Sequence, residues 1–238
     1  MEKRQILIAV PARNEAGTIA ACIRSIDVAA RRIPGNITVV VAADSCGDAT
    51  AATARGVDVQ SCGVSVIEGE WGRAGATRAA AVDHGLAQLG SRARSAWIAN
   101  TDADCVVSPS WLRVQTTMAH GVDAIGGIVR LDPRVTDPLL LDAFDASYEL
   151  DGDRHPHVHG ANIGVSVDAY RSVGGWCTNS DVGEDHVLWD ALIACGHRVR
   201  QTTTLCVLTS ARVRSRVVGG FATNLANLRP VMSAPAHV

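Results

Sequence analysis

The chain has 238 residues, 47% of them apolar, and a formal net charge of −2. This length accommodates one α/β domain, or two closely packed halves, with a full hydrophobic core. The slightly acidic balance argues against a protein that binds nucleic acid by neutralising phosphates, and no apolar run approaches the roughly 20 residues that cross a bilayer.

The seven cysteines are an odd number and form no Cys-x-x-Cys pair. We interpret them as reduced, mostly buried thiols rather than as a disulfide framework. The N-terminus runs directly into the short apolar segment 6–10, which Pro11 and charged residues follow, so no signal peptide is predicted. We therefore expect a cytoplasmic protein without a transmembrane segment.

The first hundred residues alternate between strand and helix patterns. Continuous apolar runs predict strands at 6–10, 37–42, 64–67 and 95–99, and helical patterns predict helices at 15–30, 48–55 and 74–89. Apolar strands separated by helices are typical of a parallel sheet covered on both faces. Such sheets bind ligands at the carboxyl ends of their strands.

The second half is less regular. It predicts a strand at 122–131, interrupted by two glycines, then a loop at 132–159, an apolar glycine-rich segment at 160–167 and a helix at 187–195. No linker separates the halves. We therefore expect one domain over residues 1–238, with one lobe at about 1–106 and the other at about 107–238.

Two carboxylates, Asp102 and Asp104, follow the predicted strand 95–99. Side chains two residues apart on a strand point the same way, and like charges this close disfavour joint ionisation unless a cation lies between them. Mg²⁺ and Mn²⁺ bind one or two carboxylates and complete their coordination with water and phosphate. The pair therefore predicts a divalent-metal site, whereas the second Asp-x-Asp, at 151–153, lies in a predicted loop.

Polar and acidic residues also follow the first two predicted strands. Helix capping alone accounts for Asn14 and Asp48. It does not account for Glu15, Asp44 and the Asp102–Asp104 pair meeting at one sheet edge. Carboxylates there suit the hydroxyl and ring N–H groups of a nucleoside, and a metal suits its phosphates.

Two helix starts carry further charge. Arg73 precedes the predicted helix 74–89, and Arg78 lies near its start. The helix start and the two guanidinium groups could bind an anion. Alternatively, this is an ordinary solvated helix. Neither a phosphate-binding loop with Gly-Lys-Ser/Thr nor a dinucleotide fingerprint is present. Glu184 and Asp185 lie where a helix begins: the helix dipole stabilises them there, or one of them acts as a general base.

Taken in order, seven segments resemble the family 2 glycosyltransferases of GT-A fold: 11–15, 43–50, 72–78, 102–104, 160–162, 174–176 and 184–185. The resemblance covers about residues 6–200. It implies a mostly parallel central sheet flanked by helices, and transfer of a hexose from a nucleotide-sugar, expected to be UDP-linked, to an acceptor hydroxyl. Two positions depart from the family pattern. Ala43 replaces an aspartate of many relatives, and the stretch 209–216 lacks the late histidine that is a metal ligand in many GT-A enzymes.

The resemblance also implies roles for individual residues. The nucleotide-sugar would be bound by Pro11, Arg13, Glu15, Asp44, Arg73, Arg78, Asp102 and Ala103, and Mn²⁺ or Mg²⁺ by Asp104 and Asp102. Asp185 would be the base of an inverting displacement, with Glu184 beside it. The sugar or acceptor would be bordered by His159, Gly160, Ala161, Asn162 and Trp176, and the diphosphate by Arg212 and Arg214. For Trp176, core packing is an equal alternative.

Other functions stay open from the sequence. The chain could be a retaining hexosyltransferase acting on a small metabolite such as a glycerate derivative, a sugar-phosphate nucleotidyltransferase, or a non-catalytic nucleotide-sugar binder. His155, His157 and His159 alternate along the chain and could bind Zn²⁺, although acceptor contact is the favoured role. We expect a small-molecule or lipid-linked acceptor and no nucleic acid, and leave peripheral membrane contact and the oligomeric state open.

Overall fold

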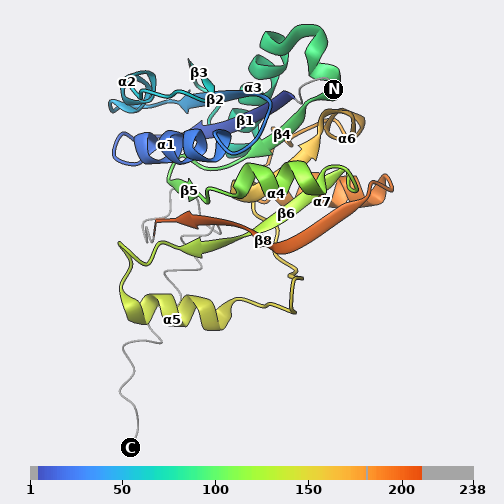
Figure 1. Ribbon diagram of the computed structural model, residues 1–238. Coiled ribbons are helices and arrows are strands. Elements are labelled where there is room, and N and C mark those ends of the chain that lie inside the picture. Colours follow the sequence, from blue (N-terminus) through green and yellow to red (C-terminus); the bar gives the residue numbers. More distant parts are fainter. Residues whose placement is uncertain (1–4, 181, 211–238) are drawn as a thin grey trace, which may run out of the picture.

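A single mixed β-sheet runs through the molecule (Figure 1), as seen in a computed structural model that describes residues 5–180 and 182–210. Within these residues the sheet has eight strands in the order β3-β2-β1-β4-β7-β6-β8-β5. The predicted α/β class is confirmed, and so is a mostly parallel sheet, although part of it is antiparallel.

The first four strands form the parallel part. They are β1 (Gln5–Ala12), β2 (Asn36–Asp44), β3 (Gly63–Gly69) and β4 (Trp97–Asn100). Each contains most of the corresponding predicted strand and differs from it at the ends by a few residues. Residues 6–10 of β1 are fully buried, because helices cover both faces of the sheet there.

The helices of this half follow the predicted order. They are α1 (Ile19–Ala30), α2 (Thr50–Arg55) and α3 (Ala74–Leu89), and a 3₁₀-helix, η1, spans Gly90–Ser95. Alternate residues of β1 pack into two cores: Ile8 joins the core that contains α1, and Leu7 joins the core that contains α3. The two faces of the sheet are therefore buried against different helices.

The second half adds four strands, three of whose pairings are antiparallel. They are β5 (Cys105–Val107), β6 (Ala124–Leu131), β7 (Ile163–Ser166) and β8 (Val199–Thr209). Strand β7 runs antiparallel to both β4 and β6, and β5 antiparallel to β8, whereas β6 and β8 are parallel. A register shift between Gly127 and Ile128 accounts for the glycine interruption seen in the sequence.

The loop predicted at 132–159 is wrong in part, because it contains helix α5 (Pro138–Ser147). Asp137 accepts hydrogen bonds from the backbone N–H groups of Leu139 and Leu140, and Pro138 occupies the first turn. The Asp137-Pro138 pair is therefore the sequence signal for the start of this helix. The other helices are α4 (Trp111–Met118), α6 (Val167–Ser172) and α7 (Glu184–Ala194), and a 3₁₀-helix, η2, spans Gly160–Asn162.

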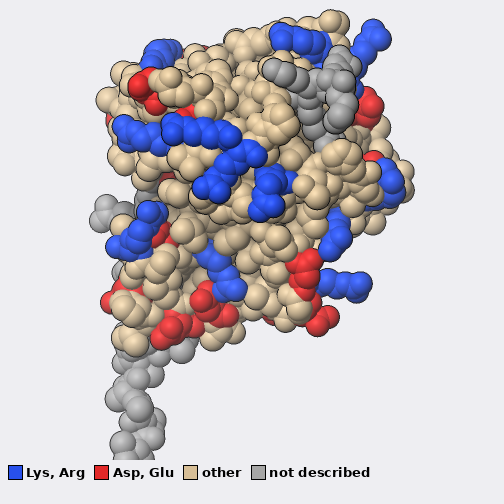
Figure 2. All heavy atoms as spheres, viewed as in Figure 1, with Lys and Arg blue, Asp and Glu red and all other residues tan. Residues whose placement is uncertain are grey.

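The surface carries both signs of charge. On the face in Figure 2, basic side chains spread over the upper part and acidic side chains gather in the lower part, where Figure 1 places α5. All seven cysteines are free thiols. Among the described residues, no helix is both long and apolar enough to cross a membrane.

Candidate functional site

The carboxyl ends of β1, β2 and β4 lie at one edge of the sheet. The three strands are parallel neighbours, with Ala12 paired to Ala43 and Ala9 to Asn100. The polar segments that follow them therefore emerge side by side, as the sequence predicts for a ligand site at a parallel sheet edge.

The loops after β1 and β2 are joined by hydrogen bonds. Asn14 Oδ1 accepts from the Gly47 backbone N–H (2.8 Å), and the Glu15 N–H donates to Thr50 Oγ1 (2.7 Å). The prediction that Asn14 caps a helix is wrong, because α1 begins only at Ile19 and Asn14 adopts a left-handed φ of 53°. Asp48 does accept the N–H of Thr50, the first residue of α2.

Asp44, at the end of β2, holds the loop that precedes α3. Its carboxylate accepts the backbone N–H groups of Trp71 (2.7 Å) and Gly72 (3.0 Å), and its side chain is buried. Arg73, exposed, is the N-terminal flanking residue of α3. If Asp44 binds a nucleoside, it therefore has to give up hydrogen bonds that it already accepts from the loop.

Asp102 and Asp104 lie in a turn after β4 and not on the strand itself, which corrects the geometric argument made from the sequence. Asp102 Oδ1 accepts from Arg78 Nη2 (2.6 Å), and Asp104 Oδ2 accepts from Ser210 Oγ (3.2 Å). Both residues are partly exposed, and Ala103 between them is buried. The two carboxylates thus reach solvent from one turn.

Arg78 connects four parts of the site. Its guanidinium pairs with Asp102 and, at 3.4 Å, with Glu184, and it lies 5.4 Å from the centre of the Trp176 ring. A side chain at Gly160 would approach Arg78 Nη2 to 2.8 Å, so the guanidinium also requires a glycine there. With only 4% of its surface exposed, Arg78 is placed to hold other site residues in position.

The site is rich in negative charge. Burial raises the pKa of Asp102 to about 6 and also raises the pKa of Glu184; the Arg78 cation opposes both shifts, and neighbouring Asp185 adds to both. Asp104 and Glu15 act on Asp102 in the same direction as Asp185. One buried arginine therefore faces several carboxylates, an arrangement that a bound cation would stabilise.

Asp185 is the second residue of α7 and faces the segment before β7. Its Oδ2 accepts the backbone N–H of Gly160 (2.9 Å). His159 lies beside Gly160, and its Nε2 is 2.7 Å from the Tyr148 hydroxyl. Burial lowers the pKa of His159 to about 4, so its imidazole is neutral near pH 7. Tyr148 was not predicted as a site residue; it lies just after the unpredicted helix α5.

Three predicted contacts with sugar or acceptor are not supported by the side-chain positions. Asn162 is fully buried: its amide donates to the carbonyls of Ile128 (2.8 Å) and Leu205 (3.0 Å) and accepts from Trp111 Nε1 (2.9 Å). Trp176 is 3% exposed, and Ala161 is also buried. These side chains support the site from below its surface.

The remaining predicted residues differ in their exposure, and two of them are not among the residues that the structure describes. Pro11 is partly exposed and Arg13 exposed at the end of β1, and Glu15 is buried, with its carboxylate accepting from Thr18 Oγ1 (2.6 Å). Arg212 and Arg214 lie outside the described residues.

The zinc alternative at the histidines is wrong. The rings of His155, His157 and His159 stack, with centroids 6.0 and 5.8 Å apart and nearly parallel planes. Stacked faces do not direct three nitrogens at one point, and no metal-binding group of three or more His, Cys, Asp or Glu side chains occurs in residues 5–180 and 182–210.

Solved structures with the same fold include several glycosyltransferases. A mannosyltransferase from Pyrobaculum calidifontis, in complex with GDP-Man and Mn²⁺, superposes with a TM-score of 0.61 at 21% identity, over 91% of this chain and 59% of that one. S. aureus TarS in complex with UDP-GlcNAc gives 0.62 at 14% identity, over 98% and 68%.

A third is glucosyl-3-phosphoglycerate synthase from Mycobacterium tuberculosis with Mn²⁺, UDP and phosphoglyceric acid, at 0.58 and 17% identity, over 97% and 78%. The chain spans less than two thirds of the mannosyltransferase and of another TarS structure, 59% and 61%. These likenesses establish the GT-A fold.

Curated protein sequences contain no match to the chain. A protein-family model does match: the one described as Glycosyl transferase family 2, over residues 7–171. The matched range contains the strand ends, the Asp102–Asp104 turn and Arg78, but ends before Asp185. Because the match covers more than half of the chain, this protein belongs to glycosyl transferase family 2.

Proposed function

We propose that this glycosyltransferase transfers a hexose from a UDP-sugar to an acceptor hydroxyl with inversion, and that it depends on Mn²⁺ or Mg²⁺. The observation that carries the proposal is the group of carboxylates at the sheet edge, where Asp104 and Asp185 lie close enough to Asp102 to raise its pKa. Solved structures of the same fold hold Mn²⁺ together with UDP or GDP-Man.

The carboxylates fit a divalent cation. Asp104 and Asp102 are partly exposed oxygen donors in one turn, and Mg²⁺-type sites use one or two carboxylates and leave other positions to water and phosphate. A third protein ligand is therefore not required. When bound, the cation would offset the negative charge that develops on the diphosphate leaving group.

Asp185 would accept the proton of the acceptor hydroxyl. As the proton moves to the carboxylate, the acceptor oxygen bonds to the anomeric carbon, and the bond from that carbon to the diphosphate breaks with its electron pair on the nucleoside diphosphate. The Gly160 N–H bonded to Asp185 Oδ2 fixes one oxygen, so the carboxylate has a defined orientation. A positioned base of this kind contributes about 10²–10⁴-fold in rate.

Glu184 and Arg78 would be positioning residues. Arg78 pairs with Asp102 on the donor side and with Glu184 on the acceptor side. The guanidinium thereby couples the turn after β4 to the start of α7. The family resemblance implied that Arg78 contacts the nucleobase or the diphosphate. We assign it the positioning role instead, because the residue is 4% exposed.

The first experiment measures thermal stability with a panel of nucleotides and nucleotide-sugars, with and without Mn²⁺. A ligand at 100 times its Kd should add about 2.7 kcal/mol of stability. We expect a Mn²⁺-dependent shift with UDP or a UDP-sugar, which Asp104→Ala removes and Asp142→Ala, an exposed change on α5, leaves intact. The absence of any nucleotide-dependent shift would refute the proposed function.

The base and the stereochemistry are tested on the reaction itself. Asp185→Asn should lower kcat by about 10²–10⁴-fold with little change in UDP-sugar affinity, while His186→Asn, the exposed neighbour, should leave kcat nearly unchanged. NMR of the product reports the anomer. Retention of the donor configuration would exclude the inverting mechanism and favour the retaining alternative.

A further inference from the structure

A cavity of about 590 Å³ lies between the segment that follows α5 and strand β8. Its wall includes Glu149, Asp151, Arg154, His155 and Gln201. The volume is within the range of small-molecule sites, about 300–1,000 Å³. None of these five side chains belongs to the carboxylate site at the strand ends.

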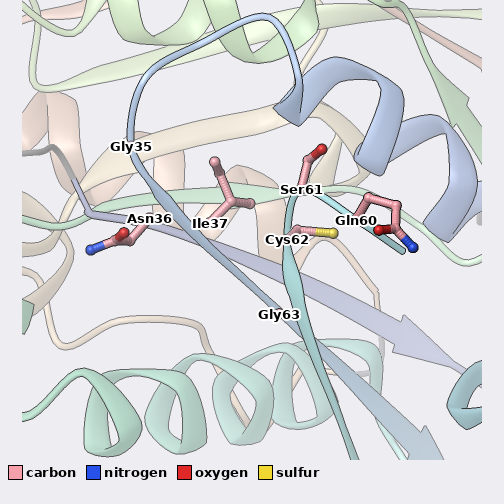
Figure 3. A pocket seen from close by; sticks show the side chains of 7 residues that line it. All are labelled: Gly35, Asn36, Ile37, Gln60, Ser61, Cys62 and Gly63. Atoms are coloured by element: carbon pink, nitrogen blue, oxygen red, sulfur yellow. The ribbon is translucent and has the colours of Figure 1, made fainter. Parts of the chain in front are cut away.

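A second cavity, of about 280 Å³, gives a useful contrast (Figure 3). It lies at the amino ends of β2 and β3, and is lined by residues 35–37 and 60–63, without a charged side chain. The close-up shows that residues 35–37 and 60–63 come from two neighbouring segments and that their side chains are short or uncharged. Nothing in this second cavity indicates a ligand.

His155 forms a buried part of the wall of the larger cavity. The residue is 4% exposed, and both ring nitrogens are buried. Backbone groups of Thr202, Gly126 and His157 lie close to the ring. The imidazole therefore shapes the wall, and hydrogen bonds to a ligand would come from the exposed wall residues.

The other wall residues favour a polyhydroxylated ligand. Arg154 and Gln201 donate hydrogen bonds, whereas Glu149 and Asp151 accept them, and sugar hydroxyls do both. The two carboxylates disfavour a phosphate or carboxylate ligand by like-charge repulsion. Leu150, 42% exposed, supplies an apolar surface for the C–H face of a ring.

The stacked histidines link this cavity to the proposed base. His155 lines the cavity, His157 follows at a centroid distance of 6.0 Å, and His159 follows at 5.8 Å. His159 adjoins Gly160, whose N–H binds Asp185. The Tyr148 ring lies against His157, with centroids 3.9 Å apart, and its hydroxyl contacts His159. The row is a wall of aromatic rings that leads from the cavity to the reacting centre.

We propose that this cavity is a distal acceptor subsite that binds a sugar ring of a glycan acceptor, while the hydroxyl that is glycosylated lies at Asp185. This inference rests on the proposed function and adds to it the acceptor class: a saccharide of two or more rings. The histidine row is the wall along which the acceptor chain lies.

Saturation-transfer NMR tests binding without turnover. The probes are methyl glucoside and methyl mannoside, each with the matching disaccharides and trisaccharides, added to the full chain with UDP and Mn²⁺. We expect saturation transfer to at least one oligosaccharide, and binding at least about tenfold weaker for its one-ring counterpart. No transfer to any oligosaccharide, or displacement of a bound one by inorganic phosphate, would overturn the subsite.

Variants locate the binding. Arg154→Ala and Glu149→Gln change exposed wall residues without buried packing, and each should weaken the oligosaccharide about tenfold but leave the one-ring probe unchanged. His155→Phe keeps the ring shape and removes only buried nitrogens, so it should leave the oligosaccharide affinity nearly unchanged. Arg24→Ala, exposed on α1, is the control. Oligosaccharide affinity that neither Arg154→Ala nor Glu149→Gln alters would place binding elsewhere and overturn the subsite.

The two proposals fail differently. The thermal shift with UDP and Mn²⁺ depends on Asp104 and not on the cavity. A retained nucleotide shift without oligosaccharide binding refutes the subsite alone. Loss of the nucleotide shift in the wild-type chain refutes the proposed function, and with it the acceptor role of the cavity.

Discussion

Arg78 is the buried cation on which the arrangement of the site depends. Its side chain is 5% exposed and pairs with two carboxylates, so its removal leaves Asp102 and Glu184 without their counter-ion. Breaking a buried ion pair from one side costs about 3–5 kcal/mol. We expect Arg78→Met to lower the free energy of unfolding by about 3 kcal/mol, measured by urea denaturation.

Arg55 provides the matched control. It pairs with Glu68 where both side chains are about half exposed, 52% and 57%, and exposed pairs contribute about 0–1 kcal/mol. Arg55→Ala should therefore cost less than about 1 kcal/mol. If the two variants lost the same free energy of unfolding, the ion pairs of Arg78 would be no stronger than an exposed pair. That result would contradict the positioning role of Arg78.

Asp44 fixes the loop before α3 through two backbone N–H groups, those of Trp71 and Gly72. Asp44→Ala removes both acceptors, so hydrogen exchange of these two amides should accelerate about tenfold. NMR-detected exchange measures this. Asp58→Ala, on an exposed residue whose carboxylate accepts from the Gln60 side chain, is the control. Unchanged exchange at Trp71 would contradict the anchoring role.

At the scale of elements, the Asp153 carboxylate joins the segment between α5 and β7 to β8 through several hydrogen bonds. Asp153 accepts from Thr202 Oγ1 (2.6 Å), Thr203 Oγ1 (3.1 Å) and Thr204 Oγ1 (3.2 Å), and pairs with Arg200. These hydrogen bonds hold the pKa of Asp153 well below its usual range. The segment therefore depends on the ionised form of this side chain.

This gives a pH dependence. A carboxylate whose pKa is lower in the folded state stabilises that state above its unfolded pKa, about 4, and the contribution is lost as pH falls below that value. Asp153→Asn should cost about 1–2 kcal/mol at pH 7 and less at pH 3. Urea unfolding of the wild type and the variant at pH 7 and pH 3 measures the difference in their free energy of unfolding, with Asp151→Asn as control. A difference that is the same at both pH values would contradict this account.

The elements differ in how well their sequences predict them. Strands β1, β2 and β4 are short continuous apolar runs bounded by polar or turn residues, and the predicted helix 74–89 has the observed bounds of α3. Length and flanking residues identify such segments from the sequence. Strand β8 and helix α4 were missed: β8 contains three consecutive threonines, and α4 has only eight residues. Helix α5 lies within the predicted loop 132–159, although Asp137 and Pro138 form a capping signal at its start.

At the scale of the whole molecule, one hydrophobic core runs across both predicted lobes. It contains Ile8 and Ile23 from the first lobe, and Ile125 and Leu205 from the second. A shared core couples the unfolding of the two lobes. We predict one transition in urea, coincident by tryptophan fluorescence and by far-ultraviolet circular dichroism.

Gly127→Ala sharpens this test. A Cβ at Gly127 would lie 2.3 Å from Asn162 Nδ2 and 2.4 Å from the Leu205 carbonyl, where β6, η2 and β8 meet. The substitution should lower the midpoint urea concentration of unfolding by the same amount in fluorescence and in circular dichroism. Two separate transitions, or a shift in one probe only, would show that the lobes are independent domains.

The sequence by itself determined the α/β class, the order of the first strands and helices, and the polar segments at the strand ends, because periodicity and strand direction are local properties. Its loose motifs, taken in order, also pointed to the family. Only the tertiary structure decided that Arg78 is buried between Asp102 and Glu184, that Asn162 and Trp176 support the site from within, and that the three histidines stack. These roles depend on contacts between residues as much as 106 positions apart, and neither burial nor pairing across such a separation is encoded in a local pattern.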